Sequence, residues 1–458
     1  MPGTEVEGRK LAGLIRGEYQ VQKSIIGASK AALSGSSLSY SGTRAYAWAL
    51  VAMLWIISFL NYADRSVLSA VMPQIRAEFQ LTPPQLALLS SSFLWVYAIA
   101  ASLAGYLGDR FSRKRVILAG LVTWSLLTFL TPFAGTFVIF VLLRAFTGLG
   151  EASYYPAGTA LISDYHGPET RSRALAIHQT AVFAGGGIGT LIAAALADRF
   201  QWRLPFYAYG AIGLLIAVVV AAMMRDTPPA VKRQAKTEQG TFAFVLRRRS
   251  ALMLYAVFFF ATSVSAGVTI WAPTFFHDTM NFSLTQATFY GAATINLAGF
   301  CAVLCGGTLA DWAAVRFKVG RFYVLAGGLC LAAVFLLPFG LLRDANLLGL
   351  CLLLAGFSKG LFDGCIYAAM HDVVPPFARA TAVGMMTTLG FLGAGLSPLV
   401  IAWLGEAFGL GAAISLMALL YLIGVILLLL SRRVTIAVME DSERRIAATA
   451  ALRREHNE

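Results

Sequence analysis

Long apolar stretches separated by short polar segments run through this chain of 458 residues. A helix that crosses a membrane needs about 20 mostly apolar residues. Twelve stretches of this kind are present, with expected limits 45–73, 85–108, 115–134, 136–163, 173–197, 204–224, 251–276, 286–310, 322–342, 346–371, 380–405 and 410–431. The pattern therefore predicts an all-α membrane protein with twelve transmembrane helices.

Composition and charge support this prediction. The chain is 58% hydrophobic and 13% charged, whereas a soluble domain is about 45–50% apolar and about 25% charged. If the twelve spans alternate in direction, 29 of the 36 Lys and Arg residues lie on one side. Because Lys and Arg accumulate in cytoplasmic loops, we expect a multi-pass protein of the cell membrane (the inner membrane), with both termini cytoplasmic. We attribute the net charge of +13 to the basic cytoplasmic loops and to their attraction to anionic membrane lipids. We therefore expect no nucleic-acid partner.

A polar segment with two prolines divides the spans into six and six. We expect a cytoplasmic amino-terminal tail at 1–44, a six-helix bundle at 45–224, a cytoplasmic linker at 225–250, a second six-helix bundle at 251–431 and a cytoplasmic carboxy-terminal tail at 432–458.

The two halves repeat. Span four matches span ten at three positions with a constant offset of 208 residues (359 − 151 = 208), namely Gly148 with Gly356, Glu151 with Lys359, and Asp164 with Asp372. The loop after span two, Gly105-x-x-x-Asp109, returns after span eight as Gly307-x-x-x-Asp311. Repeats of six spans predict duplicated bundles related by an axis along the membrane normal.

These motifs carry a family resemblance. The loop that begins Gly105-x-Leu-Gly-Asp109-Arg resembles the signature of the major facilitator superfamily, over residues 45 to 431. The strings Asn61-Tyr62-x-Asp64-Arg65 and Gly148-x-Gly150-Glu151-Ala-Ser-Tyr154 are similar to the Spinster-type branch. The anion:cation symporter branch shares the first string. The resemblance implies two pseudo-symmetric bundles in the major facilitator fold.

The resemblance also implies a gate where span two ends. Gly105 lets a neighbouring helix approach closely, and Asp109 could pair with Arg113 and with a helix amino terminus of the other bundle. Asp311 marks the second copy, which we expect to be weaker because Ala314 stands where the counterpart of Arg113 is expected. The alternative is that these basic loops only orient the chain.

Four ionisable residues lie inside spans one and four. Glu151 and Arg144 are seven residues apart, so they share a helix face about 10 Å apart along the axis. With Asp64 and Arg65 they form a set of zero net charge. Charges inside a membrane usually mark function; Glu151 and Asp64 are candidates for proton coupling, and Arg144 and Arg65 for substrate binding. The alternative is a static network that joins span one to span four.

Further candidates for substrate binding are Lys359, Asp363, Tyr62, Tyr154 and Asn296. Lys359 suits an anionic group of the substrate, or a salt bridge to Glu151 that breaks on protonation. An internal pair with Asp363, four residues along the helix, is the alternative. For the aromatic residues the alternative is packing.

The favoured function is a secondary active transporter that works by alternating access and is coupled to protons. The substrate is either an amphipathic, lipid-like molecule, as the Spinster resemblance implies, or an organic anion such as a small organic acid or sugar acid carried by an anion:proton symporter. The chain has no phosphate-binding loop of the Gly-x-x-x-x-Gly-Lys-Ser/Thr type, which argues against drive by ATP. We expect no enzyme activity, metal or cofactor, and a monomer.

Overall fold

The computed structural model describes residues 44–166, 170–226, 246–374 and 379–455; the side chains at 102–110, 171–173, 176, 379–381, 432–435 and 437–455 are outside this description. The chain divides into two units, Met1–Trp48 and Ala49–Glu458. Of the first unit only residues 44–48 are described, and they are the start of the first helix. The expected tail at 1–44, apart from Arg44, and most of the expected linker therefore lie outside the described residues.

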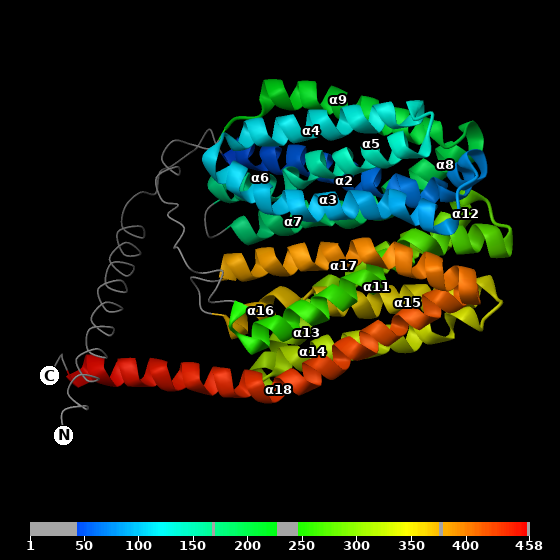
Figure 1. Cartoon of the computed structure of the whole chain (residues 1–458). Coiled ribbons are helices and arrows are strands. Elements are labelled where there is room, and N and C mark those ends of the chain that lie inside the picture. Colours follow the sequence, from blue (N-terminus) through cyan, green and yellow to red (C-terminus); the bar gives the residue numbers. More distant parts are fainter. Residues whose placement is uncertain (1–43, 167–169, 227–245, 375–378, 456–458) are drawn as a thin grey trace, which may run out of the picture. The chain divides into compact units, whose positions relative to one another are not determined.

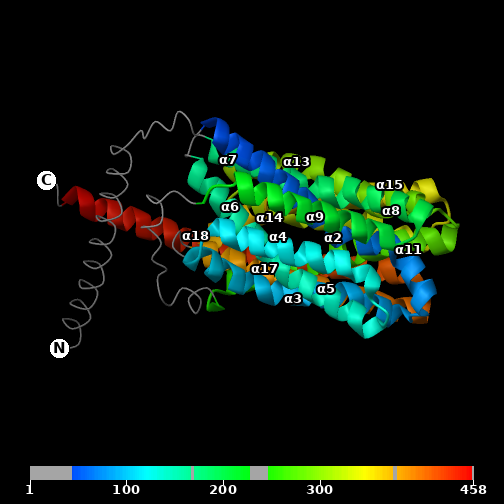
Figure 2. The ribbon, with the colours of Figure 1, turned by 90° about the horizontal axis from the view of Figure 1, so that it is seen from above.

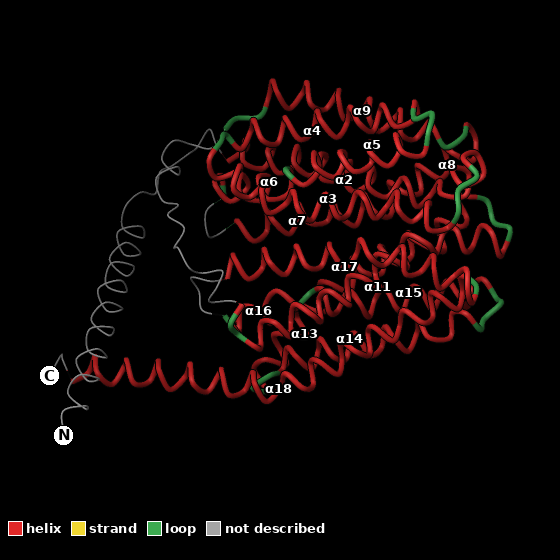
Figure 3. Tube along the Cα trace, viewed as in Figure 1, coloured by secondary structure: helices red, strands yellow, loops and turns green. Residues whose placement is uncertain are grey.

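Regular structure in the described ranges is helical throughout (Figure 3). The first half of the molecule contains α2 (Arg44–Phe79), α3 (Pro83–Arg110), α4 (Arg113–Leu130), α5 (Phe137–Ala152), α6 (Tyr154–Tyr165), α7 (Arg171–Ala184), α8 (Thr190–Phe200) and α9 (Arg203–Met223), with short helices η1 (Thr131–Phe133) and η2 (Gly185–Gly189). The second half contains α11 (Arg249–Met280), α12 (Leu284–Thr288), α13 (Thr294–Arg316), α14 (Gly320–Leu336), α15 (Ala345–Asp363), α16 (Ile366–Val373), α17 (Arg379–Phe408) and α18 (Leu410–Glu455), with η3 (Phe289–Ala293) and η4 (Leu337–Gly340).

Within the described residues, twelve helical segments are long and apolar enough to cross a membrane, and this confirms the predicted fold class. Apolar side chains on the outside of the bundle agree with a lipid environment: Leu215, Val218 and Leu304 are 65%, 68% and 63% exposed. Water would disfavour such a surface, whereas hydrocarbon accepts it.

Within the described residues, spans four, five, eight and ten are each interrupted away from their ends. Ser153 separates α5 from α6, and residues 364–365 separate α15 from α16, so spans four and ten each break shortly after their ionisable residues. In spans five and eight the α-helical pattern is replaced by the π-helical turns η2 and η3. Such turns are rare and often occur at functional sites.

The two halves meet along two seams. In one, α3 runs beside α17; in the other, α7, η2 and α8 pack against α12, η3 and α13 (Figures 1 and 2). We call the end of the bundle with the α3–α4 and α13–α14 connections the Arg113 end. The opposite end, with the connections after α2 and α11, is the Arg76 end. The ionisable residues lie between the two ends.

Candidate functional site

A cluster of buried charges joins α2 to α5. The Nε and Nη2 atoms of Arg65 donate to Oε2 of Glu151 at 3.2 and 3.1 Å, and Nη2 also donates to Oδ1 of Asn61 at 3.3 Å. The Glu151 side chain is fully buried, and that of Arg65 is 13% exposed. Among the described residues, the second oxygen of Glu151 has no hydrogen-bond partner. Glu151 is thus held through one of its two carboxylate oxygens.

Asp64 has a different partner from its neighbour Arg65. Its Oδ2 atom accepts a hydrogen bond from the hydroxyl of Thr128 on α4 at 2.5 Å, and Oδ1 has no hydrogen-bond partner within the described ranges. This division follows from helix geometry, because adjacent residues point about 100° apart. The analysis of the sequence missed Thr128, since one hydroxyl in an apolar span carries no signal of its own.

Arg144 is the least satisfied member of the cluster. It is 1% exposed, yet its Nε and Nη1 atoms have no hydrogen-bond partner in the part of the chain that the structure describes. Its guanidinium carbon lies 5.0 Å from the centre of the Phe93 ring. A buried, unpaired donor on a charged group is costly. The substrate-binding role expected for Arg144 stays a prediction.

The ionisable pair of the second half forms within one helix. The ammonium of Lys359 on α15 lies 2.6 and 2.7 Å from the two carboxylate oxygens of Asp363. Lys359 and Glu151 therefore have separate partners, and the alternative of an internal pair is the one that forms. The Asp363 side chain is 36% exposed and that of Lys359 is 8% exposed.

The remaining candidates have varied surroundings. Tyr62 lies against Arg65, whose guanidinium carbon is 4.5 Å from the ring centre. The Tyr154 hydroxyl is buried, donates to the Leu54 carbonyl at 2.5 Å and lies 2.8 Å from Nε2 of His178, so its bonding capacity is used inside the first half. Asn296 connects the halves: its amide donates to the carbonyls of Gly186 in η2 and Ala292 in η3, at 3.4 and 2.9 Å.

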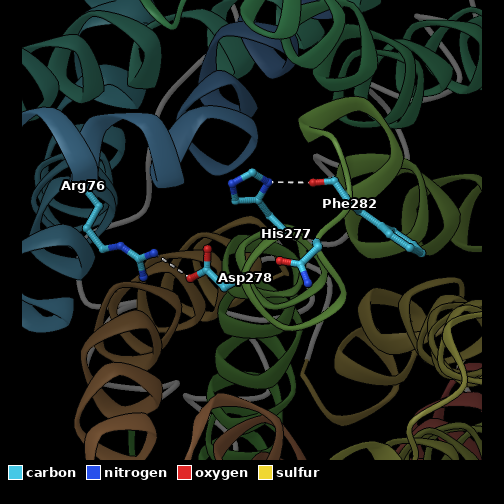
Figure 4. A pocket seen from close by; sticks show the side chains of 5 residues that line it. Arg76, His277, Asp278 and Phe282 are labelled. Carbon is cyan, nitrogen blue, oxygen red and sulfur yellow. Dashed lines mark hydrogen bonds and ion pairs between the residues drawn. The ribbon is translucent and has the colours of Figure 1, made fainter.

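At the Arg76 end, polar contacts fasten the two halves together. Arg76 on α2 forms an ion pair of 2.8 Å with Asp278 on α11. This pair lines an open pocket of about 460 Å³, where His277 also bonds the Phe282 carbonyl (Figure 4).

A second fastening at the same end joins α8 to the start of α12. Asp198 accepts hydrogen bonds from the Leu284 amide at 2.9 Å, the Thr285 amide at 2.8 Å and the Thr285 hydroxyl at 2.6 Å. A carboxylate at a helix amino terminus also interacts favourably with the helix dipole.

At the Arg113 end, the ion pairs of the described side chains stay within each half. Arg113 pairs with Asp164, and Arg321 pairs with Asp372 at 2.8 Å and with Asp311 at 3.0 Å. The expectation of a second copy without its arginine is wrong: Arg321 is the counterpart of Arg113, at the same offset of 208 residues (321 − 113 = 208). The side chains of Gly105 and Asp109 lie outside the described residues, so the partner expected for Asp109 stays a prediction.

Among the described residues, polar contacts join the halves at the Arg76 end, and the helices of the two halves also pack along the two seams.

Comparisons with known proteins agree with this architecture. The family model of the Major Facilitator Superfamily matches residues 54–396 and 300–454. A probable sulfoacetate transporter of Cupriavidus necator is 28% identical over 380 residues, covering 79% of this chain and 87% of that protein. The cis,cis-muconate transport protein of Acinetobacter baylyi is 29% identical over 397 residues, covering 84% and 93%.

A further relative is the protein spinster of Drosophila melanogaster, 29% identical over 379 residues, or 79% of this chain; the match spans only 62% of the Drosophila protein. Among solved structures, a bacterial homologue of the human lysosomal transporter Spinster, in an inward-facing and occupied conformation, superposes with a TM-score of 0.75 over 85% of this chain and 97% of that one, at 21% identity. At that identity the likeness concerns the fold. With twelve spans, two repeated halves and a family model that matches most of its length, the chain is a multi-pass membrane transporter and belongs to the major facilitator superfamily.

Proposed function

We propose that this transporter moves a small organic anion together with a proton by alternating access. The observation that carries the proposal is the state of the buried cluster. Among the described residues, two donor atoms of Arg144 and one oxygen of Glu151 have no hydrogen-bond partner. A carboxylate or sulfonate group could accept a charge-assisted hydrogen bond from either donor atom of Arg144.

Charge balance explains why the anion and the proton move together. Two arginines and two carboxylates sum to zero when all four are charged. A proton on Glu151 leaves one uncompensated positive charge in a buried site, which is costly, and an anion on Arg144 removes it. Binding of either partner therefore favours binding of the other.

The seams between the halves support an anion over a lipid-like substrate. An amphipathic molecule that enters sideways needs an opening between spans five and eight or between spans two and eleven. In this structure Asn296 bonds the Gly186 carbonyl across the first seam, and the rings of Tyr97 and Phe391 lie 4.5 Å apart across the second. Relatives described as a spinster protein and as transporters of sphingosine-1-phosphate keep the lipid-like substrate as the second candidate.

The distribution of Lys and Arg supports an orientation. It favours the cytoplasm for the Arg113 end, so that the Arg76 end faces outward. In the proposed mechanism, the contacts of Asp198 and Arg76 then close the outer side and must break during transport.

A neutralised carboxylate tests the coupling. In proteoliposomes, Glu151→Gln should abolish accumulation driven by a pH gradient but keep exchange of substrate down its own gradient, because glutamine resembles a permanently protonated glutamate. Glu78→Gln is the matched control: Glu78 forms hydrogen bonds with Arg203 and Trp202 at the Arg76 end, away from the cluster, and its variant should accumulate substrate normally. Accumulation by Glu151→Gln equal to that of the unchanged protein contradicts the coupling role.

A thermal-shift screen against small carboxylates, sulfonates, sugar acids and lysolipids identifies the substrate class. Arg144→Lys keeps the charge but loses the planar pair of donors. We expect the Kd of the best anion to rise at least about tenfold, since a hydrogen bond to a charged group contributes about 1.5–3 kcal/mol. A hit among lysolipids alone, with affinity unaffected by Arg144→Lys, favours the lipid-like substrate instead.

A further inference from the structure

Aromatic rings enclose the guanidinium of Arg65. Its central carbon lies 4.4, 4.5, 5.4 and 5.7 Å from the ring centres of Tyr97, Tyr62, Phe93 and Phe391 respectively. A cation within about 6 Å of a ring centre is attracted by the negative face of the ring. Three of these rings belong to the first half of the molecule, as Arg65 does. Phe391 comes from α17 in the second half.

Close packing of α17 on α3 puts the Phe391 ring there. A Cβ atom added to Gly395 would lie 2.5 Å from atoms of the Trp95 indole, so the missing side chain allows the contact. Phe391 and Gly395 are one helical turn apart and share a face of α17. Phe391 also packs on a small apolar cluster to which both halves contribute, with Phe93, Tyr97 and Ala152 from the first and Ala394 from the second.

We propose that Phe391 is a positioning residue that couples the arrangement of the two halves to the Arg65–Glu151 ion pair. Its ring reaches Arg65 only while α17 lies against α3. The contact therefore stabilises the state closed at the Arg76 end relative to a state in which α17 has moved away. A contact made in one of two states shifts their ratio by its own free energy.

The position of Arg65 makes this coupling consequential. The guanidinium bonds Glu151, which the proposed function uses as the proton carrier, and the inference rests on that function for its role in transport. With the ring in place, the guanidinium and the carboxylate are shielded from water. Charge interactions are stronger in such a site than in water. Once α17 withdraws, water replaces the ring and the pair weakens. Each change of conformation is thus transmitted to the carboxylate through a group of the opposite half.

The test measures the ratio of the two states without any substrate. Spin labels at Gly135 and Leu341 report the separation of the halves at the Arg76 end by electron paramagnetic resonance. A side chain added at Gly135 meets nothing within 4 Å, and Leu341 is 84% exposed. Singly, doubly and triply fluorinated phenylalanine at position 391 keep the shape of the ring while removing its negative face in steps. We expect the fraction open at the Arg76 end to rise in the same steps, up to about 2- to 5-fold, corresponding to about 0.5–1 kcal/mol.

Two comparisons separate this coupling from simple packing. The same fluorinated series at Phe339, a buried residue of the second half that packs on Phe275 and Phe276, should leave the ratio unchanged. In an Arg65→Gln background the series at Phe391 should also lose its effect, because the cation is gone.

A flat response at Phe391, or a graded response that persists without Arg65, overturns the inference. Because no substrate is present, failure here leaves the proposed anion transport untouched. Conversely, failure to find a transported anion does not alter this measurement.

Discussion

The contact between Asp198 and α12 predicts how the transporter opens. The first turn of α12 exposes backbone amides that need acceptors. Ser283 accepts from the Gln286 amide within the second half, whereas Asp198 of the first half accepts from the Leu284 and Thr285 amides. Asp198→Ala should therefore destabilise the state in which the Arg76 end is closed.

The size of the effect follows from the number and kind of bonds. Loss of a side chain that caps a helix amino terminus costs about 0.5–2 kcal/mol. On opening, the carboxylate and the amides are hydrated, so this range applies to the difference between the two states. It corresponds to an increase of about 2- to 30-fold in the open-to-closed ratio at 1.4 kcal/mol per factor of ten. Asp278→Asn, which breaks the partly exposed pair with Arg76, should have a smaller effect, because exposed pairs contribute about 0.2–1 kcal/mol.

The spin labels at Gly135 and Leu341 measure this ratio in a variant in which the five free cysteines are replaced by serine or alanine. Glu78→Gln serves as the control, because the Glu78–Arg203 pair lies at the same end but within the first half. An unchanged distance distribution in Asp198→Ala would show that the contact does not hold the halves together. Equal opening in Glu78→Gln would show that loss of any charge at that end has the same effect.

Two further predictions concern the site and the seam. Thr128→Val should lower the unfolding midpoint of the purified protein by an amount equivalent to about 1–3 kcal/mol, because it removes the hydrogen bond to the buried Asp64 carboxylate. Thr128→Ser keeps the hydroxyl and should behave like the unchanged protein. Equal midpoints for the valine and serine variants would contradict the role of this hydroxyl. Gly395→Ala should raise the fraction of molecules open at the Arg76 end, because the added Cβ would lie 2.5 Å from Trp95 and must separate α17 from α3. Gly327→Ala is the matched control, since an added Cβ there meets nothing within 4 Å. An equal open-to-closed ratio in both variants would refute the argument.

Much of the architecture could be predicted from the sequence, because a membrane imposes a local rule. A span must be apolar over about 20 residues and must satisfy its own backbone hydrogen bonds. The number and order of the spans and the division into two halves follow from that rule. The constant offset of 208 residues also relates Arg321 to Arg113 as its counterpart in the second half, although the loop motif alone led to Ala314.

The partners of the charged residues depended on the tertiary structure. Glu151 and Arg65 are separated by 86 residues, and nothing in either span distinguishes this pairing from one with Lys359 across the molecule. The contact of Asp198 with α12 could not be predicted from the sequence either. Every helix has the same backbone amides, and only the position of the Leu284 and Thr285 amides in the first turn of α12 leaves them free to donate to a carboxylate.

The sequence by itself determined which segments cross the membrane and that the chain consists of two repeated halves. It also determined that the candidate charged residues inside the membrane lie in spans one, four and ten. The tertiary structure decided which charges meet, which half contributes each aromatic ring around Arg65, and which end of the bundle is closed. The physical reason is the range of the forces. Hydrophobic patterning acts along one helix, whereas ion pairs, ring contacts and helix caps depend on atoms a few ångströms apart that come from distant parts of the chain.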